Sequence, residues 1–203
     1  MRIALSVLTL LVIPTFAFAA APAKTEVAGD WTLDPYHSRV GFVVKHLGVS
    51  NVRGEFKEFA TPVLKGDAQG KISALEATAA TKSVSTGIEK RDDHLRSDDF
   101  FNAEKFPTET LVLKSIKWAG DKFTAEVEVT LRDKSKLVKF EGEKSPLTRV
   151  DLGQGPTIRV GYSASGKINR KDFGLSWNKV IETVNVVADE VKLEIELELF
   201  KKA

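Results

Sequence analysis

Apolar and polar residues alternate along much of this chain, as they do in β-strands that have one buried face and one wet face. The clearest runs are residues 122–131 and 191–199, where lysine, glutamate or threonine occupies the positions between the apolar ones. A third run places Val40, Phe42 and Val44 on one face, with Val43 as the exception. Parallel strands buried on both faces read instead as continuous apolar runs, so the alternation predicts antiparallel sheet.

Further strands are expected at residues 52–59, 70–83, 108–118, 137–143 and 157–168. Turn-like stretches separate the strands at residues 65–67, 119–121, 132–135 and 153–156. About eight strands joined mostly in sequence order predict an all-β sandwich or an up-and-down barrel. A barrel of about eight strands has room inside for side chains or for one small ligand.

Residues 85–101 break the alternation and are dense in charge. We predict a short helix at residues 88–97, followed by an irregular segment at residues 98–106 that ends before Pro107. Ile88, Arg91 and Leu95 fall near helical spacing, so the apolar stripe is thin. Such a helix is expected to sit on a sheet rather than inside it.

The first residues have the order of a secretory signal peptide. Arg2 is followed by an apolar run to Phe16 and by Ala17-Phe18-Ala19, a small-any-small cleavage pattern. A membrane anchor is the alternative, but the run is shorter than the roughly 18–20 apolar residues that span a bilayer. We therefore predict removal of residues 1–19, a periplasmic protein without a stable membrane anchor, and one domain at residues 27–201.

The composition excludes some covalent modifications and one class of binding partner. The 203 residues contain no cysteine, so neither disulfides nor a lipid-modified cysteine are available. The formal net charge of +2, from 30 basic and 28 acidic residues, gives no field that would select nucleic acid. The mature chain must be stable through its own core.

Patterns of catalytic chemistry nearly match and then fail. Residues 161–165 resemble a nucleophile elbow, but Ser165 stands where the second glycine should be. Residues 153–158 resemble a dinucleotide loop, but Ile158 occupies the third glycine position. His37, His46 and His94 lack the close spacing of a metal site. We expect no enzymatic activity, no metal and no cofactor.

Three polar residues stay open to two interpretations. His46 falls on the Phe42 and Val44 face, so it is either a hydrogen-bonded core histidine or a contact to a ligand head group. Arg91 and Arg96 either pair with local aspartates on a solvated helix or present donors to a phosphate or carboxylate.

The order and spacing of several segments resemble the YceI-like family of bacterial periplasmic proteins. They are residues 46–56 (HLGVSNVRGEF), 91–101 (RDDHLRSDDFF), 129–132 (VTLR), 168–178 (INRKDFGLSWN) and 189–195 (DEVKLEI). The resemblance runs from about Gly29 to Leu199. One departure is the stretch 131–138, which lacks the glycine and proline usual in the family, so any role of that turn is in doubt.

The resemblance implies a lipocalin-like antiparallel β-barrel that holds a polyisoprenoid or related long-chain lipid in its interior, as a dimer, without catalysis or metal. Inward alternation then selects the residues expected to line a lipid tunnel: Val40, Phe42, Val44, His46, Phe56, Leu111, Leu113, Val127, Val129, Phe140, Tyr162, Leu193 and Ile195.

Two other classes of function compete with a lipid carrier. The lining residues could fill a solid core, which would leave an envelope stress or interaction module that acts without a ligand. A lipid-modifying enzyme would need a polar constellation inside, where only His46 and Tyr162 are in view.

Overall fold

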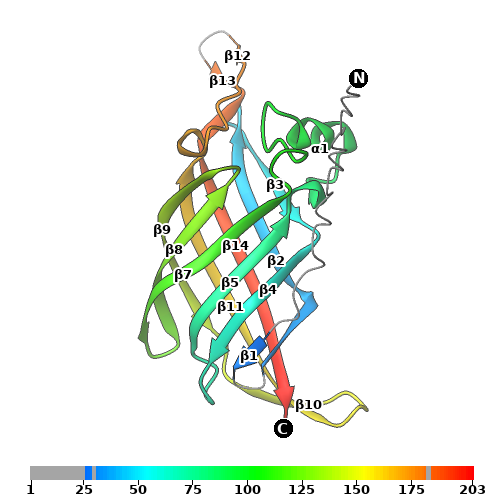
Figure 1. Cartoon of the computed structure of the whole chain (residues 1–203), viewed down its shortest axis with the longest axis vertical. Coiled ribbons are helices and arrows are strands. Elements are labelled where there is room, and N and C mark those ends of the chain that lie inside the picture. The colour runs from blue at the N-terminus through cyan, green and yellow to red at the C-terminus, as the bar shows by residue number, and fades with distance from the viewer. Residues whose placement is uncertain (1–25, 29–30, 182–183) are drawn as a thin grey trace, which may run out of the picture.

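The computed structural model describes residues 26–28, 31–181 and 184–203, and Figure 1 draws the remainder as a thin grey trace. The predicted signal peptide at residues 1–19 lies outside the described residues. The described chain is mostly β-sheet with one short α-helix, as the alternation predicts.

One large sheet of twelve strands runs through the molecule, in the order β1-β4-β5-β7-β8-β9-β11-β14-β2-β3-β6, with β10 paired to β11. Its strands are β1 (Glu26–Ala28), β2 (Thr32–His46), β3 (Ser50–Phe56), β4 (Phe59–Gly66), β5 (Ile72–Ala80), β6 (Val84–Ser85), β7 (Thr108–Ala119), β8 (Lys122–Leu131), β9 (Lys134–Lys144), β10 (Thr148–Asp151), β11 (Pro156–Asn169) and β14 (Val187–Lys202). A second, two-stranded sheet joins β12 (Val180–Ile181) to β13 (Val184–Asn185).

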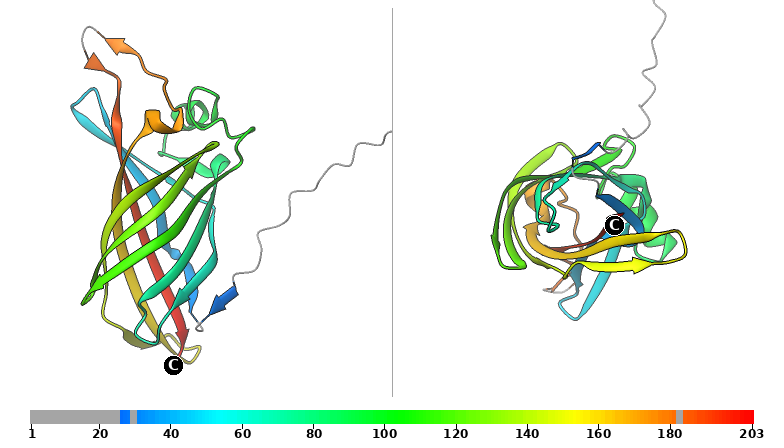
Figure 2. Two further views of the ribbon diagram at one scale, coloured as in Figure 1. Left: turned by 60° about the vertical axis from the view of Figure 1, so that its left-hand side comes forward. Right: turned by 90° about the horizontal axis from the view of Figure 1, so that it is seen from below.

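Every pairing in the large sheet is antiparallel except that of β1 with β4. The sheet is strongly curved, and Figure 2 shows it wrapping around the long axis of the molecule. Strands from both halves of the strand order therefore pack into the same core, as Phe56 of β3 and Ala79 of β5 do. Among the described residues, no ladder joins the two ends of the strand order, β1 and β6.

Most predicted strands are confirmed, but the structure has more strands than the alternation predicts. The short β1, β6 and β10 have no counterpart in the predicted set, and the one strand predicted at residues 52–59 is two, because β3 ends at Phe56 and β4 begins at Phe59. Strand β4 lacks a clear alternation because Pro62 falls at a register shift between Ala60 and Val63. A proline has no amide hydrogen for the ladder, and a bulge moves side chains out of the period of two.

The helix expected at residues 88–97 is confirmed as α1 (Glu89–Arg96). It covers one end of the curved sheet, beside β3 in Figure 1. Residues 98–106 form turns rather than regular structure, as expected. Two short 3₁₀ turns, η1 (Thr81–Ser83) and η2 (Arg170–Phe173), complete the described elements. Within the described ranges, no helix has the length and apolar character needed to cross a bilayer.

The hairpin that departs from the family pattern forms a two-residue connection between β8 and β9. Leu131 pairs with Lys134, and Arg132 adopts a φ of 59°, which is unusual for a residue other than glycine. The backbone N–H of Arg132 donates to Glu109 at 2.9 Å, and its Nη1 donates to the carbonyl of Gly174 at 3.0 Å. These bonds hold the turn in place without the glycine and proline.

Candidate ligand-binding cavities

A cavity of about 380 Å³ lies inside the end of the sheet that α1 covers. Its walls come mainly from the C-terminal end of β2, from β3, from the first half of β14, from α1, and from the segments that follow α1 and β11. We call it the outer cavity. Aliphatic and aromatic side chains make most of its lining, including Phe42, Leu95, Trp177 and Leu193.

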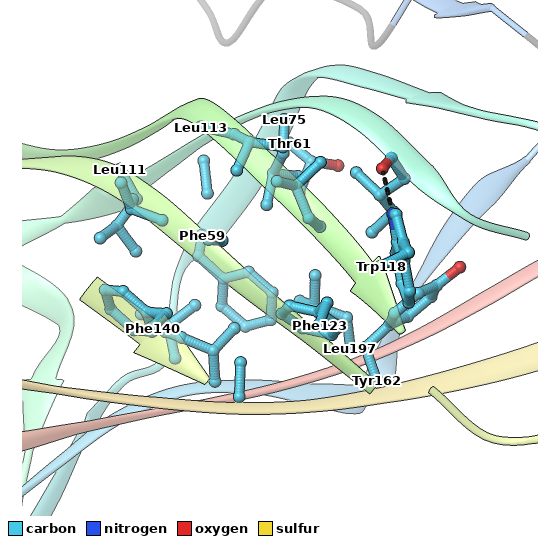
Figure 3. Close-up of a pocket in the computed structure, with 18 residues that line it drawn as sticks. Phe59, Thr61, Leu75, Leu111, Leu113, Trp118, Phe123, Phe140, Tyr162 and Leu197 are labelled. Atoms are coloured by element: carbon cyan, nitrogen blue, oxygen red, sulfur yellow. Dashed lines mark hydrogen bonds between the residues drawn. The ribbon is translucent and has the colours of Figure 1, made fainter. Parts of the chain in front are cut away.

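A second cavity of about 70 Å³, the inner cavity, is lined by residues of β2, β4, β5, β7, β8, β9, β11 and β14 (Figure 3). Phe59, Leu113, Phe123 and Phe140 project into it, and Trp118 donates its indole N–H to the carbonyl of Ile72 at 3.2 Å. A third space of about 40 Å³ lies between them, and its lining includes Phe56, which also borders the outer cavity, and Leu111, which also borders the inner one.

Three aromatic rings form a floor beneath the outer cavity. The centroids of Phe56 and Phe101 are 5.6 Å apart, and the Phe42 centroid lies 6.3 Å from Phe56 and 6.4 Å from Phe101. Position 54 must be glycine for this packing, because a Cβ there would lie 2.3 Å from Cζ of Phe42. Strand β3 thus makes room for a ring from β2.

The residues predicted to line a lipid tunnel are distributed over these three spaces. Those at the outer cavity are Phe42, Val44, His46, Phe56 and Leu193. Those at the inner cavity are Val40, Leu111, Leu113, Val127, Phe140, Tyr162 and Ile195. Val129 lines the small space between them. All of them face the interior, although the structure places them around separate spaces rather than around one tunnel.

The two arginines predicted to meet a head group lie in different places. Arg91 lines the outer cavity. Arg96 does not, since its Nη1 binds Asp93 at 2.7 Å and Glu89 at 3.2 Å, and its Nε donates to the carbonyl of Lys82 at 3.1 Å. Only Arg91 is therefore positioned to contact a ligand in the outer cavity.

Sequence reasoning missed part of the wall. Phe100, Phe101, Leu175 and Trp177 line the outer cavity but lie in segments without strand periodicity. The ring of His94 packs edge-on against Phe100 at 5.0 Å and Trp177 at 4.8 Å. The density of aromatic residues in two irregular segments was the signal that could have placed them at a site.

Arg170 fixes the segment that carries Trp177. The residue is 3% exposed, and its guanidinium donates to the carbonyls of Leu175, Trp177 (2.8 Å), Ala188 (3.0 Å) and Val187 (3.5 Å). Burial lowers the pKa of this guanidinium, although Asp189, 3.3 Å away, opposes the shift. Four of its hydrogen bonds therefore go to backbone carbonyls, and the group acts as a structural cross-link between residues 175–177 and β14.

Two further polar groups are buried beside the cavities. Burial raises the pKa of Glu109 to about 8, against the hydrogen bonds it accepts from Arg132 and Thr81. The hydroxyl of Thr61, in the wall of the inner cavity, has no hydrogen-bond partner among the described residues. The hydroxyl of Tyr162 donates to the carbonyl of Gly70, and burial raises its pKa.

One group of potential metal ligands occurs in the described part of the chain. Oxygen or nitrogen atoms of Asp34, His37 and Glu198 lie within 4.8 Å of one another. Nη1 of Arg159 already donates to both carboxylates, at 2.9 Å to Asp34. Although burial opposes ionisation, the hydrogen bonds from Arg159 and His37 lower the pKa of Asp34. A guanidinium therefore supplies the positive charge that a metal ion would bring.

A curved antiparallel sheet around apolar cavities, with a helix over one end, defines a mostly β protein with a hollow apolar interior. The chain belongs to the YceI-like domain family, whose model matches residues 31–199. It is 34% identical over 167 residues to Protein YceI of Escherichia coli O157:H7, and the matched region covers 79% of this chain and 84% of that relative. It is also 35% identical over 176 residues to a UPF0312 protein of Staphylococcus aureus, covering 83% and 96%.

Solved structures share the fold. The YCEI protein of Campylobacter jejuni superimposes with a TM-score of 0.66 at 34% identity, covering 85% of this chain and 98% of that one. A polyisoprenoid binding domain from Saccharophagus degradans superimposes with a TM-score of 0.57 at 16% identity, covering 86% and 99%, which shows similarity of fold alone.

Proposed function

We propose that this protein binds a long-chain apolar lipid, of polyisoprenoid or fatty type, inside the sheet. The observation that carries the proposal is the outer cavity, which offers about 380 Å³ within an otherwise packed core and is lined mainly by apolar side chains. Small-molecule sites are typically concave and apolar with a few placed polar groups. The description of the Saccharophagus degradans structure as a polyisoprenoid binding domain supports the same class of ligand.

The energy of such binding is adequate for a carrier. Removing on the order of 500 Å² of ligand surface from water contributes roughly 12 kcal/mol before costs. Loss of translation and ordering of a flexible chain take back much of this. The remainder supports reversible binding, which a carrier needs in order to release its lipid.

The curvature of the sheet supports a barrel that surrounds the ligand. Strands β3 and β5, far apart in the strand order, both border the space between the two larger cavities through Phe56 and Ala77. A lipid chain that displaced the rings of Phe42, Phe56 and Phe101 would pass from the outer cavity into the inner one. We propose this lipocalin-like arrangement as the lipid-bound form.

We also propose that the protein acts in the periplasm after removal of residues 1–19, as a domain of residues 27–201 and as a homodimer. The cleavage pattern Ala17-Phe18-Ala19 supports export. The intact mass of the protein from the envelope fraction tests this, because a mass that retains the first 19 residues would contradict cleavage.

Native mass spectrometry of protein purified from its own host tests the main proposal. We expect one lipid to remain bound to each chain, and chloroform extraction followed by mass spectrometry to identify it. Protein that carries no lipid, and that takes up none when mixed with long-chain lipids, would instead support a solid core and a role as an interaction module. Chemical change of the added lipid would favour an enzyme.

A further inference from the structure

The ionisable side chains that line the outer cavity are all of basic residue types. They are Lys45, His46, Arg91, His94 and Arg170, and no aspartate or glutamate belongs to the lining in the described part of the chain. Such one-sided chemistry at an apolar cavity points to the sign of the ligand's charge.

Three of these five groups have other roles. Arg170 is bound to backbone carbonyls and Asp189, and Nε2 of His94 lies 2.7 Å from Asp99. Lys45 is exposed and alternates with the inward-facing Val44 and His46, so we assign its charge to solvent. Arg91 and His46 are the two that remain.

Arg91 is held in place by a neutral partner. Its Nε donates to the hydroxyl of Thr86 at 2.6 Å, and its Nη2 donates to the carbonyl of the same residue at 3.0 Å. The Thr86 hydroxyl in turn donates to the buried carboxylate of Asp92, which also accepts from the Thr86 backbone N–H at 2.8 Å. The Nε and Nη2 edge of the guanidinium is thus oriented by a hydrogen-bond network.

The other edge of the guanidinium, which carries Nη1, is available to a ligand. For Nη1 of Arg91 no hydrogen bond is found to any described residue, and no carboxylate of the described chain lies within 4.0 Å of the group. Among the described residues, the histidine rings that make hydrogen bonds are those of His37 and His94, so the ring of His46, in the same lining, makes none. Asp92 reaches this guanidinium only through the Thr86 hydroxyl, so Nη1 has no direct anionic partner in the described chain. A partly buried guanidinium N–H in this state favours an anion, because charge-assisted hydrogen bonds to guanidinium are strong and directional.

We propose that the outer cavity selects an anionic amphiphile, a long apolar chain that ends in a carboxylate or phosphate, and that Arg91 binds this head group with His46 beside it. The inference rests on the proposed lipid-binding function and adds a requirement on the head group. A neutral lipid of the same length should enter the cavity but lack this contact.

The test compares three ligands that share one chain: hexadecanoic acid, hexadecyl phosphate and hexadecanol. Affinities are measured near neutral pH, below the concentration at which each ligand forms micelles, by displacement of a fluorescent fatty-acid analogue. Inorganic phosphate alone is a fourth arm. We expect at least one anion to bind about 10-fold or more tightly than hexadecanol, as one charge-assisted hydrogen bond allows. Inorganic phosphate should not compete.

Variants separate the head-group contact from the cavity. We expect Arg91→Gln to lower the affinity for the preferred anion by about 10-fold, while the affinity for hexadecanol changes by less than about 3-fold. Arg91→Lys should retain part of the preference, since it keeps the charge. Lys90→Gln is the matched control, because Lys90 is an exposed cation on the same helix outside the cavity lining, and it should change neither affinity.

Each outcome decides a separate question. If none of the three ligands binds saturably, the proposed lipid-binding function fails. If they bind with equal affinity, or if Arg91→Gln weakens acid and alcohol alike, the cavity binds lipid but the anionic head group is wrong. Competition by inorganic phosphate would also overturn the inference, because the apolar chain would then be unnecessary.

Discussion

Glu109 is a buried carboxyl group near the start of β7. It is 4% exposed and accepts hydrogen bonds from the backbone N–H of Arg132 at 2.9 Å and from the hydroxyl of Thr81 at 3.5 Å. With a pKa of about 8, against 4.5 for an ordinary glutamate, it is mostly protonated at neutral pH. It links β7 to the β8–β9 turn and borders the space between the two larger cavities.

This raised pKa predicts a loss of stability with rising pH. Between about pH 4.5 and pH 8 the folded state binds the Glu109 proton and the unfolded state does not, so the free energy of unfolding falls across that window. Glu109→Gln keeps a neutral hydrogen-bonding group and should flatten the dependence. Urea unfolding at several pH values measures it. Parallel curves for the variant and the wild type would contradict the assignment.

Thr61 offers a second test at the residue scale. Its hydroxyl is buried without a partner among the described residues, which costs free energy that a methyl group would not. Thr61→Val should therefore raise the free energy of unfolding of the lipid-free protein by about 1 kcal/mol. If Thr61→Val instead lowered the free energy of unfolding by about 1 kcal/mol, the hydroxyl would be hydrogen-bonded, for instance to buried water.

At the scale of elements, Phe42 of β2 and Phe56 of β3 line both the outer cavity and the small space between it and the inner cavity, and Phe101 after α1 packs against both rings. Replacing one of these rings by a smaller side chain should change the lengths of alkyl chain that the cavity accepts. Phe42→Leu should lower the free energy of unfolding by about 1–2 kcal/mol, because it leaves unfilled space. It should also shift the affinity ratio toward longer alkyl chains, as measured with a series of fatty acids.

Phe173→Leu is the control for that series. Phe173 is buried in the same core as the floor residues but lines none of the three cavities. This variant should cost comparable stability and leave the length preference unchanged. Equal shifts in both variants would mean that the rings of the floor do not limit chain length.

The elements that sequence could predict are those whose side chains alternate without interruption. Strand β8 begins at Lys122 and ends at Leu131, where the alternation does, because its two faces meet different surroundings along its whole length. Strand β4 was missed because Pro62 and a register shift hide its period. Local pattern reports which face a residue is on, but not where the chain bulges.

The site was predictable in part for the same reason. Inward-facing strand residues such as Phe42 and Leu113 could be found from alternation, and both line cavities. Trp177 could not, since its position depends on the bonds of Arg170 to the carbonyls of residues 175 and 177. The division of the interior by Phe42, Phe56 and Phe101 is likewise a tertiary arrangement that no local period encodes.

At the scale of the whole molecule, stability depends on the packed core and on what fills the cavities. The chain has no cysteine, so no disulfide contributes, and a reducing agent should leave the melting temperature unchanged. A ligand that binds only the folded state stabilises it by mass action, by about 2.7 kcal/mol when its free concentration is 100 times its Kd.

For a domain of this size, that stabilisation corresponds to a rise in melting temperature of roughly 5–10 °C. Thermal melts of the delipidated protein, with and without added long-chain fatty acid, measure the rise. The rise should increase with the logarithm of ligand concentration, and a fatty acid too short to fill the outer cavity should produce less of it at the same concentration. A melting temperature that did not respond to any chain length would indicate that side chains, rather than lipid, fill the interior of the folded protein in solution.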